Sequence, residues 1–117
     1  MNLKIESHVT DGVTILTCHG RIAFGEEAQA LRDMVKQVLA TTKKIILDLS
    51  DVSYMDSGGL GSLVGAYSSA RQSGADVKLI GLGPRLRDTL QITKLVTVFE
   101  VYDTEKEALA AFRGSLP

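Results

Sequence analysis

The feature that most constrains the fold is a short apolar run in the middle of the chain, Ile45-Ile46-Leu47-Asp48-Leu49. A strand with one face in water alternates apolar and polar residues, whereas a strand covered on both faces is apolar at nearly every position. Strands of this kind belong to parallel sheets, in which helices connect the strands and cover the sheet. The run therefore predicts an α/β domain with this segment as a central strand.

A β-hairpin is predicted ahead of the central strand. Residues 3–9 alternate apolar and polar side chains, Asp11-Gly12 is a strong turn signal, and residues 13–18 resume the pattern of a strand. Gly20 is expected to end the second strand. Apolar residues at helical spacing over 26–39 then predict a helix that leads into the central strand.

Strands and helices alternate through the second half of the chain. In chain order we predict a loop over 50–56, a helix that apolar residues from Leu60 to Ala70 mark and Gly74 closes, and a strand over 77–80. A helix over 84–91, a strand over 96–101 and a helix that Thr104 and Glu107 open with a capping box follow. The order β-β-α-β-α-β-α-β-α predicts a single α/β domain with a mixed β-sheet and an N-terminal hairpin. We place this domain at residues 1–113 and a loose tail at 114–117.

Composition excludes several classes of function. The 117 residues include 13 basic and 14 acidic side chains, so the chain lacks the basic excess that nucleic-acid binding requires. The single Cys18 rules out an internal disulfide and a multi-cysteine metal site, and we expect it to be a buried apolar residue. Without a signal segment or an apolar run of membrane-spanning length, the chain is expected to be a cytoplasmic protein with no membrane insertion.

The segment with the clearest functional signal is Tyr54-Met55-Asp56-Ser57-Gly58-Gly59-Leu60-Gly61. It places a hydroxyl group where a helix is expected to begin, and the free N–H groups and the dipole of a helix start tolerate negative charge. Ser57 is therefore a candidate for regulatory phosphorylation. The glycines around it are expected to leave the backbone accessible to a partner. Simple helix capping by Asp56 or Ser57 is the alternative interpretation.

A hydrolase is a second alternative, because Asp-Ser-Gly-Gly also surrounds the nucleophile of trypsin-like proteases. A nucleophilic serine requires a general base, and the only histidines are His8 and His19, both in the predicted hairpin. They lack partners at metal-binding spacing, so we interpret them as surface strand residues. Asp51 is interpreted as a turn residue. The glycines match no phosphate-binding loop, and a protease of that class needs about twice this length and a mostly β pattern.

The central strand together with Asp51-Val52-Ser53-Tyr54-Met55-Asp56-Ser57 and Gly59-Leu60-Gly61 resembles the STAS domain, and in particular the bacterial anti-sigma factor antagonists. The resemblance covers essentially the whole chain. It implies that a partner, both anti-sigma factor and serine kinase, phosphorylates Ser57 and thereby ends its own binding, and that a serine phosphatase restores it. The chain itself would be no enzyme and would hold no cofactor, because ATP belongs to the kinase. The implied partner-binding residues are Asp56, Ser57, Gly58, Gly59, Leu60 and Gly61.

Two positions depart from the family pattern. Ala23 replaces an acid that contributes to the partner-facing surface in the family, which puts kinase recognition in doubt. Gly58 stands where a second serine often follows the acceptor, so the acceptor is unambiguous but the helix start is looser. A STAS subunit that acts as a scaffold in a signalling or transporter-associated complex, without phosphorylation, is therefore kept as an alternative function.

Overall fold

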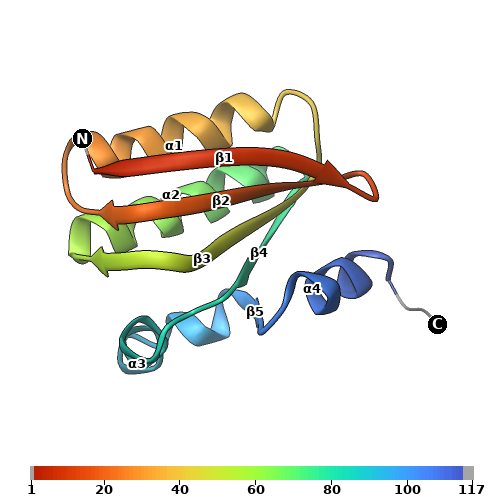
Figure 1. Ribbon diagram of the computed structural model, residues 1–117. Helices are drawn as coiled ribbons and strands as arrows, with labels where there is room; N and C mark the ends of the chain where they lie inside the picture. The colour runs from red at the N-terminus through yellow and green to blue at the C-terminus, as the bar shows by residue number, and fades with distance from the viewer. Residues whose placement is uncertain (1, 115–117) are drawn as a thin grey trace.

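The computed structural model describes residues 2–114 and contains one five-stranded mixed sheet whose spatial order, β1-β2-β3-β4-β5, is also the chain order (Figure 1). The elements are β1 (Leu3–Thr10), β2 (Val13–Ile22), α1 (Glu26–Val38), β3 (Lys44–Met55), α2 (Ser57–Gln72), β4 (Asp76–Ile80), α3 (Pro84–Ile92), the 3-10 helix η1 (Leu95–Thr97), β5 (Glu100–Tyr102) and α4 (Glu105–Phe112). The predicted fold class and element order are confirmed. Of the predicted tail, 115–117 lie outside the described residues.

The hairpin forms as predicted, but its second strand is longer. β1 and β2 pair antiparallel from Leu3–Gly20 to Thr10–Val13, and Asp11 and Gly12 have φ values of 54° and 76°. Positive φ at both central residues is typical of the hairpin turn that matches the twist of the strands. The prediction that Gly20 ends the strand is wrong, because β2 continues to Ile22. Gly20 has φ 110°, and a Cβ there would collide with the carbonyl oxygen of Asn2.

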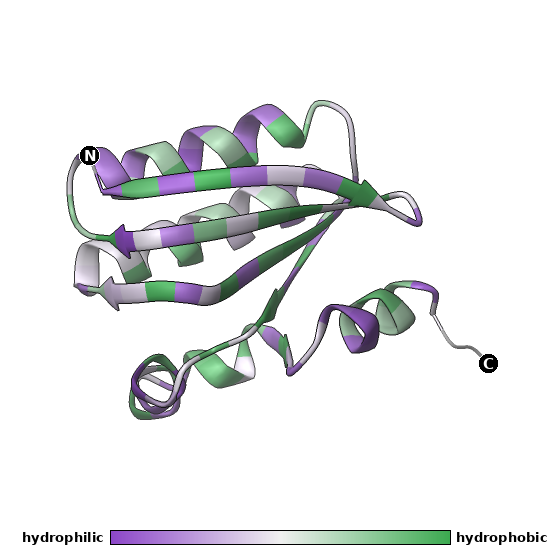
Figure 2. Ribbon diagram, viewed as in Figure 1, coloured by the Kyte–Doolittle hydropathy of each residue, from purple (hydrophilic) through white to green (hydrophobic). Residues whose placement is uncertain are grey.

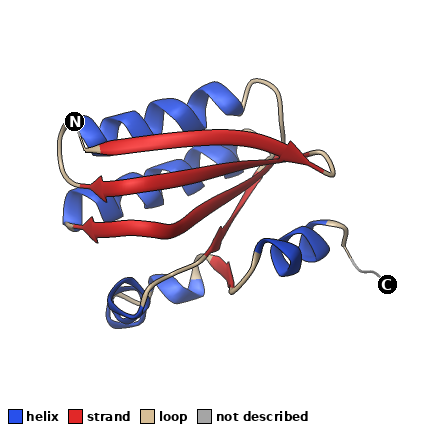
Figure 3. Ribbon diagram, viewed as in Figure 1, coloured by secondary structure: helices blue, strands red, loops and turns tan. Residues whose placement is uncertain are grey.

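The first half of β3 is covered on both faces, as its sequence predicts. Ile45 and Leu47 belong to the main core under α1 and α2, whereas Ile46 belongs to a smaller core under α4. All three are fully buried. Figure 3 shows α1 and α2 lying together behind β1–β3, and Figure 2 shows the alternating polar and apolar bands of the edge strand β1. The central and edge strands thus differ in pattern because they differ in the number of covered faces.

The predicted loop over 50–56 is wrong for most of its length, because β3 continues to Met55. This half of the strand pairs with β2 on one edge, with register shifts in that ladder, but β4 pairs only with residues 44–48. Residues 49–55 therefore have one unpaired edge. Ser50, Asp51 and Ser53 interrupt the apolar pattern here, although Val52 and Met55 still pack against the main core, so the continuous apolar run stops at Leu49.

The predicted strand over 96–101 is only partly correct. Residues 95–97 form η1, which follows Lys94 in a left-handed conformation with φ 65°, and the strand itself covers Glu100–Tyr102. Phe99, between the two elements, is buried and packs edge-on against Tyr67 with ring centroids 5.3 Å apart. The apolar residues of this segment thus serve packing in a turn as well as a strand.

The starts of α3 and α4 and the burial of Cys18 agree with the sequence predictions. Pro84 occupies the first turn of α3, and Thr104 and Glu107 form the predicted capping box of α4. Cys18 is fully buried, and burial raises the pKa of its thiol to about 12, with a smaller contribution from the charge of Asp48. Among the described residues, no helix is both long and apolar enough to span a lipid bilayer.

Candidate functional site

Ser57 is the first residue of α2 and is exposed, directly after the end of β3. The residue that caps the helix is Asp56, whose carboxylate accepts a hydrogen bond of 2.9 Å from the backbone N–H of Gly59. The capping interpretation is therefore correct for Asp56. Since the neighbouring acid caps the helix, the exposed hydroxyl of Ser57 is not needed for capping.

Asp56 also connects the helix start to the loop between β2 and α1. Its two carboxylate oxygens lie 3.0 and 3.1 Å from the backbone nitrogen of Phe24, which donates to them. The hydrogen bonds from Gly59 and then from Phe24 lower the pKa of Asp56, so the group is ionised at neutral pH. The start of α2 therefore already carries one negative charge beside Ser57.

The three nearby glycines have different surroundings, and only Gly61 has room for a side chain. A Cβ on Gly59 would collide with the carbonyl oxygen of Ile22, and a Cβ on Gly58 would lie 2.5 Å from the Cβ of Phe24. Nothing lies within 4 Å of the corresponding position at Gly61. The prediction that these glycines expose the backbone is thus wrong for Gly59, which is buried, whereas Gly58 is half-buried; both let α2 pack closely against the end of β2 and the loop that follows it.

The departure at Ala23 lies inside the protein and not on its surface. Ala23 is buried, and its N–H donates to Oε1 of Glu27 at 3.1 Å. Glu27, in the first turn of α1, also accepts from the N–H of Asn2 and from Nε of Arg21, at 2.8 and 3.1 Å. Burial raises the pKa of Glu27, but these three hydrogen bonds outweigh burial and the net pKa is lowered. The β2–α1 loop is therefore held by a buried carboxylate at one end and by Asp56 at the other.

Sequence reasoning missed both Glu27 and Phe24. Acidic residues are common in the first turn of a helix, so the position of Glu27 carried only a weak signal. Phe24 is an aromatic side chain that is 83% exposed and lies next to Gly58, the residue that follows Ser57. We call Phe24, Ser57, Gly58 and Gly61 the switch surface, since Gly61 lies one helical turn after Ser57 on the same side. Leu60, in contrast, is half-buried and packs against the main core.

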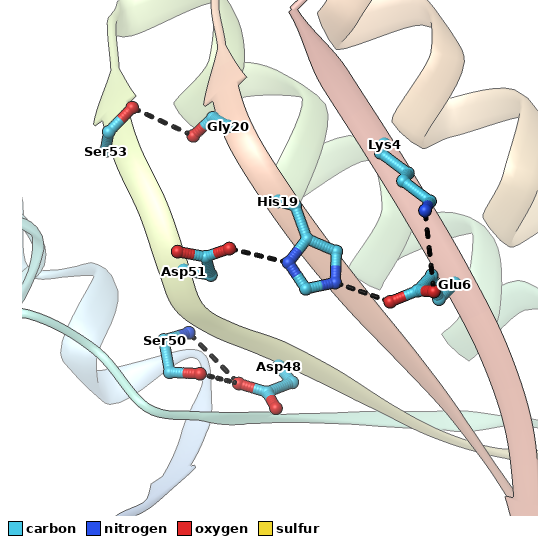
Figure 4. Close-up of polar contacts among 8 residues, drawn as sticks. All are labelled: Lys4, Glu6, His19, Gly20, Asp48, Ser50, Asp51 and Ser53. Carbon is cyan, nitrogen blue, oxygen red and sulfur yellow. Dashed lines mark hydrogen bonds and ion pairs between the residues drawn. The ribbon is translucent and has the colours of Figure 1, made fainter.

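Neither histidine is placed to serve Ser57 as a general base. The two ring nitrogens of His19 lie 2.6 Å from Oδ2 of Asp51 and 2.7 Å from Oε1 of Glu6 (Figure 4). Nε2 of His8 lies 3.7 Å from Oε1 of Glu105. Asp51 is thus a strand residue paired with His19, and its interpretation as a turn residue is wrong. Within residues 2–114, no group of three or more His, Cys, Asp and Glu side chains is arranged to hold a metal ion.

Comparison with protein families places the site in a known context. The model of the STAS domain matches residues 4–108. The chain belongs to the STAS domain family. A STAS relative, the anti-sigma-B factor antagonist of Listeria monocytogenes, is 46% identical over 109 residues, which cover 92% of this chain and 93% of the relative. The resemblance identified from Asp56 and Ser57 and the residues around them is therefore confirmed at the level of the family.

Solved STAS structures share the whole architecture. An anti-sigma factor antagonist from Mycobacterium paratuberculosis superposes with a TM-score of 0.82 at 27% identity and covers 95% of this chain and 94% of its own. The anti-sigma factor antagonist SpoIIAA matches in its unphosphorylated form, with a TM-score of 0.73, 22% identity and 96% and 98% coverage. Its phosphorylated form matches with a TM-score of 0.71, 21% identity and 95% and 99% coverage. The two SpoIIAA matches concern the fold alone.

Proposed function

We propose that this STAS domain is an anti-sigma factor antagonist of the partner-switching type. Its unphosphorylated form binds an anti-sigma factor that is also a serine kinase and so releases the sigma factor, and phosphorylation of Ser57 ends this binding. The observation that carries the proposal is the exposed hydroxyl of Ser57 at the start of α2, next to a cap supplied by Asp56. The names of the relatives support the same assignment.

The charge at the helix start makes phosphorylation an effective switch. A phosphate adds about −1.5 to −2 charges at neutral pH. The N–H of Gly59 is already taken by the ionised Asp56, so the phosphate would stand beside an existing negative charge. A partner surface shaped for a hydroxyl must then desolvate both charges. A loss of about 3 kcal/mol at the interface weakens binding by more than about 100-fold.

The chemistry of the cycle belongs to the partners. The anti-sigma factor supplies the kinase activity together with ATP, and a serine phosphatase regenerates the binding form, so the chain needs no cofactor and is no enzyme. His19 contacts carboxylates of the two neighbouring strands and His8 lies near the carboxylate of Glu105 on α4, so neither ring is directed to Ser57, which argues against the hydrolase alternative. The cycle operates on sigma factors, which places the protein in the cytoplasm.

The test is the intact mass of the protein after incubation with ATP in an extract of its native cells, followed by recovery of bound partners. Wild type should gain about 80 Da, the mass of one phosphoryl group, and Ser57→Ala should gain nothing. Ser69→Ala, an exposed serine on the same helix, is the matched control and should gain as wild type does. Ser57→Ala should retain the anti-sigma factor, and Ser57→Asp should lose it while keeping the same thermal unfolding curve.

Two results would contradict the proposal. Equal binding of the anti-sigma factor by Ser57→Ala and Ser57→Asp would show that charge at this position is not read by the partner. No mass gain in an extract that phosphorylates another substrate, combined with a stable complex, would favour a scaffold subunit that does not depend on phosphorylation.

A further inference from the structure

One face of the sheet is covered over only part of its length. The eight residues of α4 rise about 12 Å, whereas the ten residues of β2 extend about 33 Å. Val13 and Ile15 of β2 are buried in the core under α4. Thr17 and His19 follow on the same face because successive side chains of a strand alternate, and no helix covers them among the described residues. We call this uncovered part the open face.

A histidine bridges three strands on the open face. His19 of β2 contacts Asp51 of β3 through Nδ1 at 2.6 Å and Glu6 of β1 through Nε2 at 2.7 Å (Figure 4). The other charged groups facing this cluster are Lys4 of β1, 3.7 Å from Glu6, and Asp48 of β3, whose carboxylate accepts from the N–H and hydroxyl of Ser50. Arg21 of β2 pairs instead with Glu27.

The two short contacts fix the protonation state of the ring. An ionised carboxylate can only accept hydrogen bonds, so both ring nitrogens must donate, and only the imidazolium form has two N–H groups. Loss of one proton would leave a nitrogen lone pair facing a carboxylate oxygen at hydrogen-bond distance. The bridge is therefore complete only while His19 is charged and Glu6 and Asp51 are ionised.

The bridge holds a weakly paired part of the sheet. The β2–β3 ladder shifts register between Thr17 and His19 and again between Gly20 and Arg21, on either side of the His19–Asp51 pair. The opposite edge of β3 has no partner strand beyond Asp48. Side chains supply additional ties here, namely the bridge and a 3.2 Å hydrogen bond from the hydroxyl of Ser53 to the carbonyl oxygen of Gly20. Segments with few backbone bonds open more readily than the rest of a domain.

We infer that His19 is a pH-sensitive clamp on residues 50–55 of β3, which ties this segment to β1 and β2 when protonated and releases it when the proton is lost. The hydrogen bonds to Asp51 and then Glu6 raise the pKa of His19, and the bond from His19 lowers the pKa of Glu6. The clamp opens as the pH rises through the raised pKa of His19. Since residues 50–55 lead directly into Asp56 and Ser57, the clamp would make the presentation of Ser57 depend on pH, a consequence that rests on the proposed function.

The test needs only the isolated protein and is independent of any kinase. Histidine ring signals and amide hydrogen exchange are followed by NMR between about pH 5.5 and pH 8.5, and each exchange rate is converted into a protection factor to remove the intrinsic effect of pH. Amides of residues 50–55 that bond to β2 should lose about tenfold in protection as His19 loses its proton, whereas amides of β4 should not change.

Three variants distinguish the clamp from a general effect of pH. In His19→Gln the protection of residues 50–55 should no longer depend on pH. In Glu6→Gln the pKa of His19 should fall, and the change in protection should move to lower pH by the same amount; this variant keeps the test decisive if His19→Gln does not fold. His8→Gln, the matched control on the neighbouring strand, should behave as wild type. A pKa of His19 that is no higher than the ordinary 6.5, or a protection of residues 50–55 that does not change as His19 loses its proton, would overturn the inference.

Discussion

The carboxylate of Asp56 accepts the backbone N–H of Phe24, a residue that lies 32 positions earlier in the chain. This contact joins the helix that begins with Ser57 to the loop between β2 and α1. Ser57 at one end and Phe24 at the other both belong to the switch surface. The position of the exposed aromatic ring of Phe24 therefore depends on Asp56, the residue next to Ser57, so Phe24 and the start of α2 form one unit.

The contact predicts how substitutions of Asp56 behave. Asp56→Ala removes both the cap of α2 and the acceptor for Phe24, so we expect a lower melting temperature and faster exchange of the Phe24 amide. Asp56→Asn should retain most of the cap, because asparagine caps helices about as well as aspartate. Thermal unfolding and NMR exchange measure the two effects. Unchanged exchange at Phe24 in Asp56→Ala would show that the loop is held without this carboxylate.

The glycines beside Ser57 predict opposite effects on stability. Gly59→Ala forces a Cβ into the carbonyl of Ile22 and should cost about 3 kcal/mol of unfolding free energy, as overpacking does. Gly61→Ala meets nothing within 4 Å and should stabilise the protein by about 0.5 to 1 kcal/mol, because alanine is the better helix former. Urea unfolding of the two variants makes the comparison. A gain in stability for Gly59→Ala would contradict the packing described for α2.

At Lys78 we expect packing to contribute more than charge to the unfolding free energy of the core under α4. The side chain of Lys78 is 5% exposed, and its Nζ lies 4.5 Å from the centroid of the Phe112 ring. The ammonium group also pairs with the carboxylates of Asp76 and Glu100. Lys78→Met should change the unfolding free energy by less than about 1 kcal/mol, since both carboxylates keep access to water, whereas Lys78→Ala leaves a cavity and should cost about 2 to 3 kcal/mol. Equal losses in urea unfolding would indicate that the ion pairs dominate.

Alkylation of Cys18 should report unfolding of the domain. With the thiol fully buried and its pKa raised to about 12, almost no thiolate exists near pH 8, and reagents cannot reach the sulfur. The native protein should resist alkylation, and the labelling rate should rise with urea in parallel with the unfolded fraction. Rapid labelling in the absence of denaturant, measured by mass spectrometry, would show that β2 opens locally.

Acid should weaken the domain through the carboxylates that hold the β2–α1 loop. The pKa values of Glu27 and Asp56 are lowered from their ordinary 4.5 and 3.8, so their stabilising effect is complete above the ordinary values and is lost as the pH falls through the lowered ones. The urea midpoint should therefore fall between about pH 5 and about pH 2. Glu27→Gln should reduce the size of this fall. The same slope in Glu27→Gln as in wild type would assign the effect to other carboxylates.

The sequence predicted those parts of the fold that local pattern controls. Alternation identified β1, the continuous apolar run identified the first half of β3, and Asp11-Gly12 and the capping box at Thr104 gave correct boundaries. The second half of β3 was missed because Ser50, Asp51 and Ser53 break the continuous apolar run. Residues 50–55 remain a strand through pairing with β2, which is a tertiary contact and leaves no signal in the local sequence.

For the candidate site, the sequence predicted the position of Ser57 but not the contacts that hold the residues around it. Ser57 at the start of a helix followed from local pattern, and whether it is phosphorylated stays a prediction. The packing of Gly58 and Gly59 against the β2–α1 loop, and the link from Asp56 to Phe24, join segments about 30 residues apart. Contacts of this kind depend on how the helix and the sheet edge meet in space, so a single sequence does not encode them in any readable spacing.

The strand order of the sheet bears on how the protein can be assembled during synthesis. Because β1 to β5 follow one another in space as they do along the chain, each new strand adds to the edge formed by the previous one, and none has to enter between two strands that are already paired. The three strands and two helices that surround Ser57 are all encoded before Ser73. The switch surface can therefore be built on the ribosome while the C-terminal third of the chain is still being translated.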